Sequence, residues 1–315
     1  MVSGKTAIVT GAGSGINLAF AELLLSQNCN VVFADLSLRP EANAVVSRYD
    51  AKDKSPRAIF VETDVTSWPA LDKMFDVAYT EFGDVHVVCP GAGVYEPCWS
   101  SFWCPPGSKL SRDANHYALL DINLTHPIRA TQIAISRWMH PRDTRASAFP
   151  TPARVSPSNP RRIVHVASVA AQWPSVLTPL YNASKAGLCG FVRSLAPMED
   201  EYGIRVNAVA PGIVRTPIWT EDKLANVDES VDAWIPSERT AAAMLDCVEG
   251  GSRVGGTVVE VGVGHIREVG ICNDPGPPLH PGSGMFISNT EVGKLEVDNL
   301  LGDSSMWGEP PKDYE

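Results

Sequence analysis

Seven apolar runs recur along the first 261 residues, and longer segments of mixed polarity separate them. The runs lie at 6–10, 31–34, 58–65, 85–89, 162–167, 204–210 and 257–261. Short continuous runs rich in β-branched residues are typical of strands that are buried on both faces. Because strands alternate with helical segments, the pattern predicts one α/β domain, a doubly wound parallel sheet of seven strands with helices on both faces.

The first strand runs directly into a glycine-rich turn and then into a helix. Gly11, Gly13 and Gly15 lie in the turn, and leucines from Leu18 onward give the helix its apolar faces. This order places backbone N–H groups and a helix N-terminus where they can hold a pyrophosphate. A plain tight turn between strand and helix accounts for the glycines about equally well.

The second strand ends in Asp35, which favours the nucleotide interpretation. An acidic residue at this strand tip can accept hydrogen bonds from both hydroxyls of an adenosine ribose, and it repels a 2′-phosphate. The residues that follow are uncharged as far as Arg39. The sequence therefore favours NAD over NADP, although Asp35 could simply cap the following loop.

Tyr181 and Lys185 lie four residues apart on one predicted helix, and Ser168 ends the preceding strand. Residues at this spacing share a helix face. An ammonium beside a phenol favours the phenolate, so we expect a lowered pKa for Tyr181 and a role in general acid/base catalysis. Such a pair alone is more often a half-buried ring beside a solvated lysine. The other motifs of the chain therefore decide whether this pair is catalytic.

Four segments depart from the strand and helix pattern. Residues 94–114 are irregular and aromatic, which predicts a substrate-pocket wall or a subunit contact, and 141–160 is a proline-rich surface loop. The stretch from 213 to 234 predicts a lid. Residues 265–315 form an irregular tail too short for a second domain, so the predicted domain spans 1–264.

Composition narrows the function classes. The net charge is −10 and basic residues form no stripe, which argues against a nucleic-acid partner. No apolar run approaches a signal core or a membrane span, so no membrane contact is expected. Seven scattered cysteines indicate reduced thiols and a cytoplasmic location. Three residues could be imagined as metal ligands, but their spacing fits no zinc pattern and no metal is predicted: Cys98, Cys104 and His116.

Together these motifs resemble the classical short-chain dehydrogenases/reductases over residues 4–264. Within that family the chain is most similar to fungal NAD-dependent proteins of the 15-hydroxyprostaglandin dehydrogenase type. The resemblance implies a Rossmann fold. It rests on Thr10-Gly11 through Gly15-Ile16, Asp35, Asp64-Val65, Ala92-Gly93, Asn123, Ser168, Tyr181, Lys185, Pro211-Gly212 and Thr216.

The resemblance also implies roles for these residues. Tyr181 is the implied general acid/base, and Lys185 lowers its pKa and holds the nicotinamide ribose. Ser168 orients the substrate oxygen, and Asn123 fixes a water behind Lys185. The implied cofactor is NAD, with contacts from Gly11, Ser14, Gly15, Ile16, Asn17, Asp35, Leu36, Asp64, Val65, Gly91, Ala92, Gly93, Tyr181, Lys185, Pro211, Gly212, Val214 and Thr216.

The expected activity is NAD-dependent interconversion of a hydrophobic secondary alcohol and its ketone, such as a lipid, terpenoid or polyketide. The resemblance further implies a homodimer or homotetramer through helices at 115–139 and 181–196. Two alternatives stay open. One is a redox-neutral isomerase, epimerase or cyclase on the same scaffold. The other is a non-catalytic nucleotide-sensing or scaffold protein, and the presence of Ser168, Tyr181 and Lys185 argues against it, because such a protein needs no phenol with a shifted pKa.

Two positions depart from the family pattern. Asn17 stands where the glycine loop normally ends in glycine, and Pro90-Gly91 stands where two asparagines are usual. A side chain at Asn17 is expected either to crowd the pyrophosphate or to bond to it, and the proline removes an N–H donor. Neither change removes a catalytic group.

Overall fold

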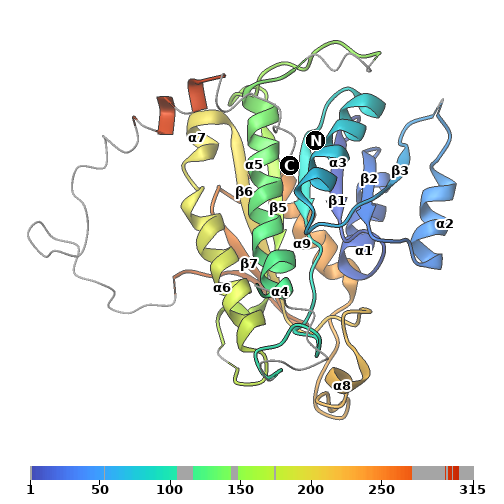
Figure 1. Ribbon diagram of the computed structural model, residues 1–315, viewed down its shortest axis with the longest axis vertical. Helices are drawn as coiled ribbons and strands as arrows, with labels where there is room; N and C mark the ends of the chain where they lie inside the picture. Colours follow the sequence, from blue (N-terminus) through green and yellow to red (C-terminus); the bar gives the residue numbers. More distant parts are fainter. Residues whose placement is uncertain are drawn as a thin grey trace, which may run out of the picture.

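The computed structural model describes residues 2–52, 54–104, 116–142, 148–173, 175–271, 295, 297–299 and 301–304. Its centre is one sheet in the order β3-β2-β1-β4-β5-β6-β7-β8 (Figure 1). The strands are β1 (Thr6–Thr10), β2 (Asn30–Asp35), β3 (Ala58–Glu62), β4 (Val87–Pro90), β5 (Arg161–Val166), β6 (Ile204–Pro211), β7 (Val258–Val261) and β8 (Ile266–Glu268). The order steps outward from β1 in both directions, which confirms the doubly wound sheet.

The central strands are buried on both faces, as the continuous apolar runs predicted. Every residue of β1 is buried, and successive side chains enter opposite layers. Ile8 belongs to the core cluster on one face, whereas Ala7 and Val9 belong to the cluster on the other. This alternation follows from the two-residue period of a strand.

Helices cover both faces of the sheet. The first layer contains α3 (Trp68–Phe82), α5 (His126–Met139) and α6 (Pro179–Ser194), whose apolar sides join one core cluster. The second layer contains α1 (Gly15–Ser26), α2 (Pro40–Arg48) and α9 (Ser237–Glu249). Figure 1 shows α5 and α6 in front of strands β5 and β6. The shorter helices are α4 (Ala118–Leu120), η1 (Asp121–Thr125), η2 (Val169–Ala171), α7 (Met198–Tyr202) and α8 (Glu221–Leu224).

The ends of α3 follow the local signals in its sequence. Ser67 is the N-cap, and its side chain accepts a hydrogen bond from the Ala70 N–H at 3.3 Å. Pro69 occupies the first turn, where a missing N–H costs nothing. Gly83 ends the helix at φ +79°, a conformation that favours glycine.

The sheet has one strand more than the sequence predicted. β8 pairs antiparallel with β7 at the edge, from Val259↔Glu268 to Val261↔Ile266. Its residues are exposed and show no apolar run, so no hydrophobic pattern revealed it. Glu260 binds Arg267 across the hairpin, with 2.8 Å from Arg267 Nε to Glu260 Oε1.

Part of the predicted tail packs against the domain. Leu301 is buried in the core cluster on the α5 side, and its carbonyl oxygen lies 2.8 Å from His140 Nε2. Residues 105–115, 143–147, 272–294 and 305–315 lie outside the described residues, so the predictions for 94–114, 141–160 and the tail are assessed only in part. No helix in the described ranges is both long and apolar enough to cross a membrane.

Candidate active site

A cleft of about 710 Å³ opens where the carboxyl ends of the central strands meet their loops. Parallel strands bring these loops to one edge of the sheet, where open α/β folds bind their ligands. The structure brings together in this cleft three predicted catalytic residues and every predicted cofactor residue. These are Gly11, Ser14, Gly15, Ile16, Asn17, Asp35, Leu36, Asp64, Val65, Gly91, Ala92, Gly93, Ser168, Tyr181, Lys185, Pro211, Gly212, Val214 and Thr216.

The glycine loop fits a dinucleotide phosphate. Gly15 has φ +60°, begins α1 and lines the cleft, so the N-terminus of that helix lies at the cleft. A Cβ added to Gly15 would lie 3.0 Å from the Thr216 side chain. The segment after β6 therefore folds over the loop, as expected for residues that cover a cofactor.

Asp35 is fixed in the cleft by the same loop. Its Oδ2 accepts a hydrogen bond from the Gly13 N–H at 2.8 Å, and its Oδ1 accepts one from the Leu36 N–H at 2.7 Å. Each carboxylate oxygen can accept more than one bond, so acceptor capacity remains for ribose hydroxyls. The exposed Arg39 also lines the cleft, so a cation lies in the same pocket as Asp35 although it is four residues away in the sequence.

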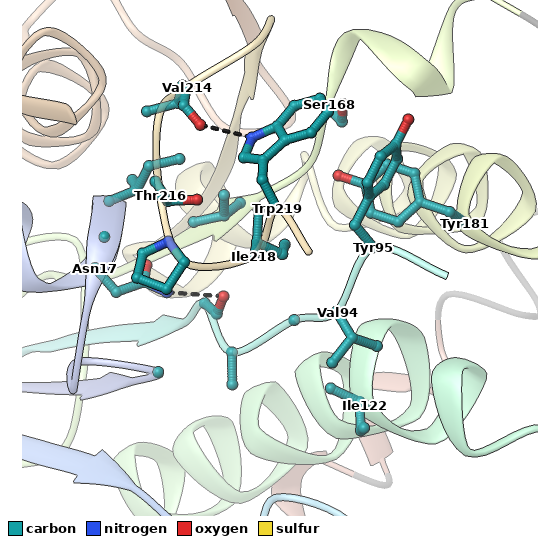
Figure 2. A pocket seen from close by; sticks show the side chains of 18 of the residues that line it. Asn17, Val94, Tyr95, Ile122, Ser168, Tyr181, Val214, Thr216, Ile218 and Trp219 are labelled. Carbon is teal, nitrogen blue, oxygen red and sulfur yellow. Dashed lines mark hydrogen bonds between the residues drawn. The ribbon is translucent and has the colours of Figure 1, made fainter. Parts of the chain in front are cut away.

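The Asn17 side chain turns toward the loop after β4. Its Nδ2 donates to the Gly91 carbonyl oxygen at 2.9 Å (Figure 2). Asn17 is also close to the buried Cys89, with 3.9 Å between Cys89 Sγ and Asn17 Oδ1. The side chain thus forms a hydrogen bond within the protein. The sequence had led us to expect that it would either crowd the pyrophosphate or bond to it.

Ser168 and Tyr181 meet at the other end of the cleft. Both residues line the cleft, and both are buried. Burial raises the pKa of Tyr181 to about 12, and the nearby Ser168 hydroxyl opposes only part of that rise. The expected fall in this pKa was therefore wrong for the protein without ligands, because the sequence spacing reveals proximity to Lys185 but not the depth of burial.

Lys185 is the cation beside this phenol. Its Nζ lies 5.5 Å from the centroid of the Tyr181 ring and donates to the Val166 carbonyl oxygen at 2.8 Å. Burial lowers the pKa of Lys185 to about 8. The β5 strand end thus holds the ammonium in the cleft wall, next to Gly93, where a ribose could reach it.

Asn123 lies behind the cleft, in the π-helical turn η1 between α4 and α5. Such turns widen a helix locally and often occur at functional sites. Its Oδ1 accepts from the Val94 N–H at 2.9 Å, and its Nδ2 donates to the Val94 carbonyl oxygen at 2.8 Å. Asn123 therefore fixes the chain after Gly93, and its predicted role in a water relay stays a prediction.

Aromatic side chains form the wall opposite the phosphate loop. The ring centroid of Tyr95 lies 4.7 Å from that of Tyr181 in an edge-to-face arrangement, and 5.1 Å from that of Trp219. Trp219 packs edge-to-face on Trp234 at 5.4 Å, which holds together the segment predicted as a lid. Trp219 Nε1 donates to the Val214 carbonyl oxygen at 2.8 Å, so the indole is fixed over the cleft (Figure 2).

Two residues were missed from the sequence: Tyr95, which lines the cleft, and Glu96, which is buried next to it in the chain. Glu96 is fully buried, yet it lies in a segment read only as irregular and aromatic. No sequence signal identifies it, because glutamate is usually exposed and its partner at Tyr181 lies 85 residues away.

The structure offers no metal cluster within the described ranges. Cys98, Cys104 and His116 do not come together as a group of metal ligands. His116 instead pairs with the Asp121 carboxylate.

The sequence matches one known protein family over most of its length. The family model for short chain dehydrogenases matches residues 5–226. The chain belongs to the short-chain dehydrogenase family. The match covers the glycine loop, Ser168 and the Tyr181–Lys185 helix, and it confirms the family expected from the motifs.

Several proteins similar to this chain are named as dehydrogenases. The chain is 28% identical over 219 residues to rat (Rattus norvegicus) 15-hydroxyprostaglandin dehydrogenase [NAD(+)], covering 69% of this chain and 71% of that enzyme. It is 32% identical over 214 residues to cis-4-hydroxycyclohexanecarboxylate dehydrogenase of Sinomonas cyclohexanicum, covering 68% and 75%. Its fold resembles that of 3-ketoacyl-(acyl-carrier-protein) reductase from Brucella melitensis complexed with NADH, at 21% identity and a TM-score of 0.65, covering 84% of this chain and 99% of that one.

Proposed function

We propose that the protein is an NAD(H)-dependent oxidoreductase that interconverts a hydrophobic secondary alcohol and its ketone. The observation that carries the proposal is one cleft that joins a glycine loop, a buried Ser168–Tyr181 pair and an aromatic wall. The alcohol-oxidising relatives support this chemistry. The Asp35 carboxylate and the NAD(+)-dependent relatives support NAD as the cofactor.

The residues of the cleft could hold a dinucleotide along its length. The glycine loop and the start of α1 would receive the pyrophosphate, and Asp35 the adenosine ribose. Lys185 and the segment at 91–93 would receive the nicotinamide ribose. A bound nicotinamide ring would supply the hydride acceptor or donor.

The remaining chemistry is a proton transfer by the protein. In the reducing direction the neutral Tyr181 phenol gives its proton to the ketone oxygen, while the Ser168 hydroxyl donates a hydrogen bond to that oxygen. In the oxidising direction the phenolate takes the proton of the alcohol, and the Lys185 ammonium stabilises the phenolate. The aromatic wall of Tyr95 and Trp219 favours an apolar substrate such as a lipid, terpenoid or polyketide alcohol.

The decisive experiment follows NADH absorbance with a panel of apolar secondary alcohols, for the natural protein and for Tyr181→Phe. We expect turnover with at least one alcohol and NAD, and a loss of about 10³-fold or more in Tyr181→Phe. NADH affinity measured by fluorescence should stay within about threefold, since the phenol oxygen contributes little to dinucleotide binding. Undiminished turnover in Tyr181→Phe would remove the acid/base assignment.

A further inference from the structure

The Glu96 carboxylate joins the substrate wall to the first turn of the helix that carries Tyr181. Its Oε2 accepts a hydrogen bond from the Tyr181 backbone N–H at 2.9 Å. Its Oε1 accepts from the Phe102 N–H at 3.1 Å and from the Ser101 hydroxyl at 3.4 Å. One buried side chain therefore spans two segments that lie 85 residues apart in sequence.

The helix end needs this carboxylate. Tyr181 is the third residue of α6, so its N–H has no acceptor inside the helix. Thr178 is the N-cap residue, but its side chain makes no capping bond within the described structure and donates to Asn182 Oδ1 at 3.1 Å instead. Glu96 supplies the missing acceptor, and its charge is favourable at a helix N-terminus.

The backbone at Glu96 is held in an uncommon conformation. Its φ is +39°, in the left-handed region that residues with a side chain rarely adopt. Such a conformation persists only where the surroundings enforce it, and such positions cluster at functional sites. The hydrogen bonds from Tyr181, Ser101 and Phe102 are the surroundings that enforce it here.

The position of Glu96 also sets the position of its neighbour. Tyr95 precedes it and places its ring edge-to-face against the Tyr181 ring at 4.7 Å. Because Glu96 bonds to the Tyr181 backbone and follows Tyr95 directly, a buried, charge-assisted hydrogen bond keeps the two backbone segments together. The phenol is thus held laterally by Tyr95 and along the helix by Glu96.

We propose that Glu96 is a positioning residue of the reaction, which sets the Tyr181 phenol against the aromatic substrate wall. The proposal rests on the acid/base role of Tyr181 described above. It assigns to Glu96 no contact with substrate or cofactor. Small displacements of a reacting group can cost about 10²-fold in rate, so the tether should affect kcat more than dinucleotide affinity.

The test compares Glu96→Ala, Glu96→Gln and the control Glu22→Gln, which removes the same charge from an exposed site on α1. Glu96→Ala should lower kcat about 10- to 100-fold with NADH affinity within about twofold. The kcat of Glu96→Gln should lie between that of Glu96→Ala and that of the natural protein, because the glutamine amide can accept a hydrogen bond at only one of the two positions. Glu22→Gln should match the natural protein.

Amide hydrogen exchange provides a readout that needs no substrate. In Glu96→Ala the Tyr181 amide and the 101–103 backbone should both exchange at least about tenfold faster, whereas in Glu96→Gln at least one of the two should, and the amides of β1 should not change in either variant. A kcat within twofold of the natural value, or unchanged exchange at Tyr181, in folded Glu96→Ala would overturn the proposal. If Glu96→Ala does not fold, Glu96→Gln decides: a kcat within twofold of the natural value, or unchanged exchange at both Tyr181 and 101–103, would overturn it. If the natural protein oxidises no alcohol, the proposed function fails, and the exchange experiment still tests the tether.

Discussion

The Asn17 side chain occupies the space into which a side chain at Gly91 would project. A Cβ added to Gly91 would lie 2.7 Å from Asn17 Cγ and 2.8 Å from its Nδ2, closer than real Cβ contacts. In the family pattern glycine stands at position 17, in the first turn of α1, and asparagine at position 91, after β4. The chain therefore carries the two residue types exchanged across one contact, as expected if the two departures compensate each other.

This contact predicts strong coupling between the two positions. Gly91→Asn alone should overpack the loop and lower the free energy of unfolding by about 1–3 kcal/mol. Asn17→Gly alone should cost about 1 kcal/mol, since it removes the hydrogen bond to the Gly91 carbonyl oxygen. The double variant Asn17→Gly/Gly91→Asn should regain most of the loss and bind NADH like the natural protein. Urea unfolding and NADH fluorescence titration measure both effects, and simple additivity would contradict the compensation.

The nucleotide end of the cleft predicts how cofactor preference can be changed. Asp35→Ala should weaken NADH binding about 10- to 100-fold, because charge-assisted hydrogen bonds to the ribose are lost. The substitution should weaken NADPH binding much less, since the repulsion of the 2′-phosphate disappears and Arg39 lines the same cleft. Arg39→Ala in the Asp35→Ala background serves as the control and should remove the residual NADPH binding. Competition titrations decide, and a natural protein that prefers NADPH would refute the assignment to NAD.

In the proposed mechanism, the titration of Tyr181 predicts different pH responses for the two directions. Burial raises the pKa of the phenol to about 12, so the neutral form dominates below that value. Reduction uses the neutral form and should lose nothing to this titration between about pH 6 and 9. Oxidation uses the phenolate, so kcat/KM for the alcohol should rise as pH rises, by up to about tenfold per unit. Initial rates in both directions test this, and an oxidation rate independent of pH would contradict it.

Much of the site was predictable because its determinants are local in sequence. The order of strand, glycine loop and helix, the acid after β2 and the four-residue spacing of Tyr181 and Lys185 each fix a local geometry. Parallel strands then bring those pieces to one edge of the sheet, and the structure confirms that they line one cleft.

What the sequence did not reveal depends on contacts between distant segments. Asn17 reaches Gly91, and Glu96 reaches the amide of Tyr181, and neither partner follows from spacing along the chain. The predicted shift in the pKa of Tyr181 had the wrong direction for the same reason, because the burial that raises this pKa results from the whole fold. The edge strand β8 was missed because its exposed residues show no hydrophobic period.

The fixed indole of Trp219 gives the protein an internal optical probe. Its ring lies in the cleft wall against Tyr95, and its N–H is bonded to the Val214 carbonyl oxygen. Indole emission overlaps the absorption of a reduced nicotinamide, so energy transfer from Trp219 would report dinucleotide occupancy without any label. Replacing this one tryptophan by phenylalanine would separate its signal from that of the other seven.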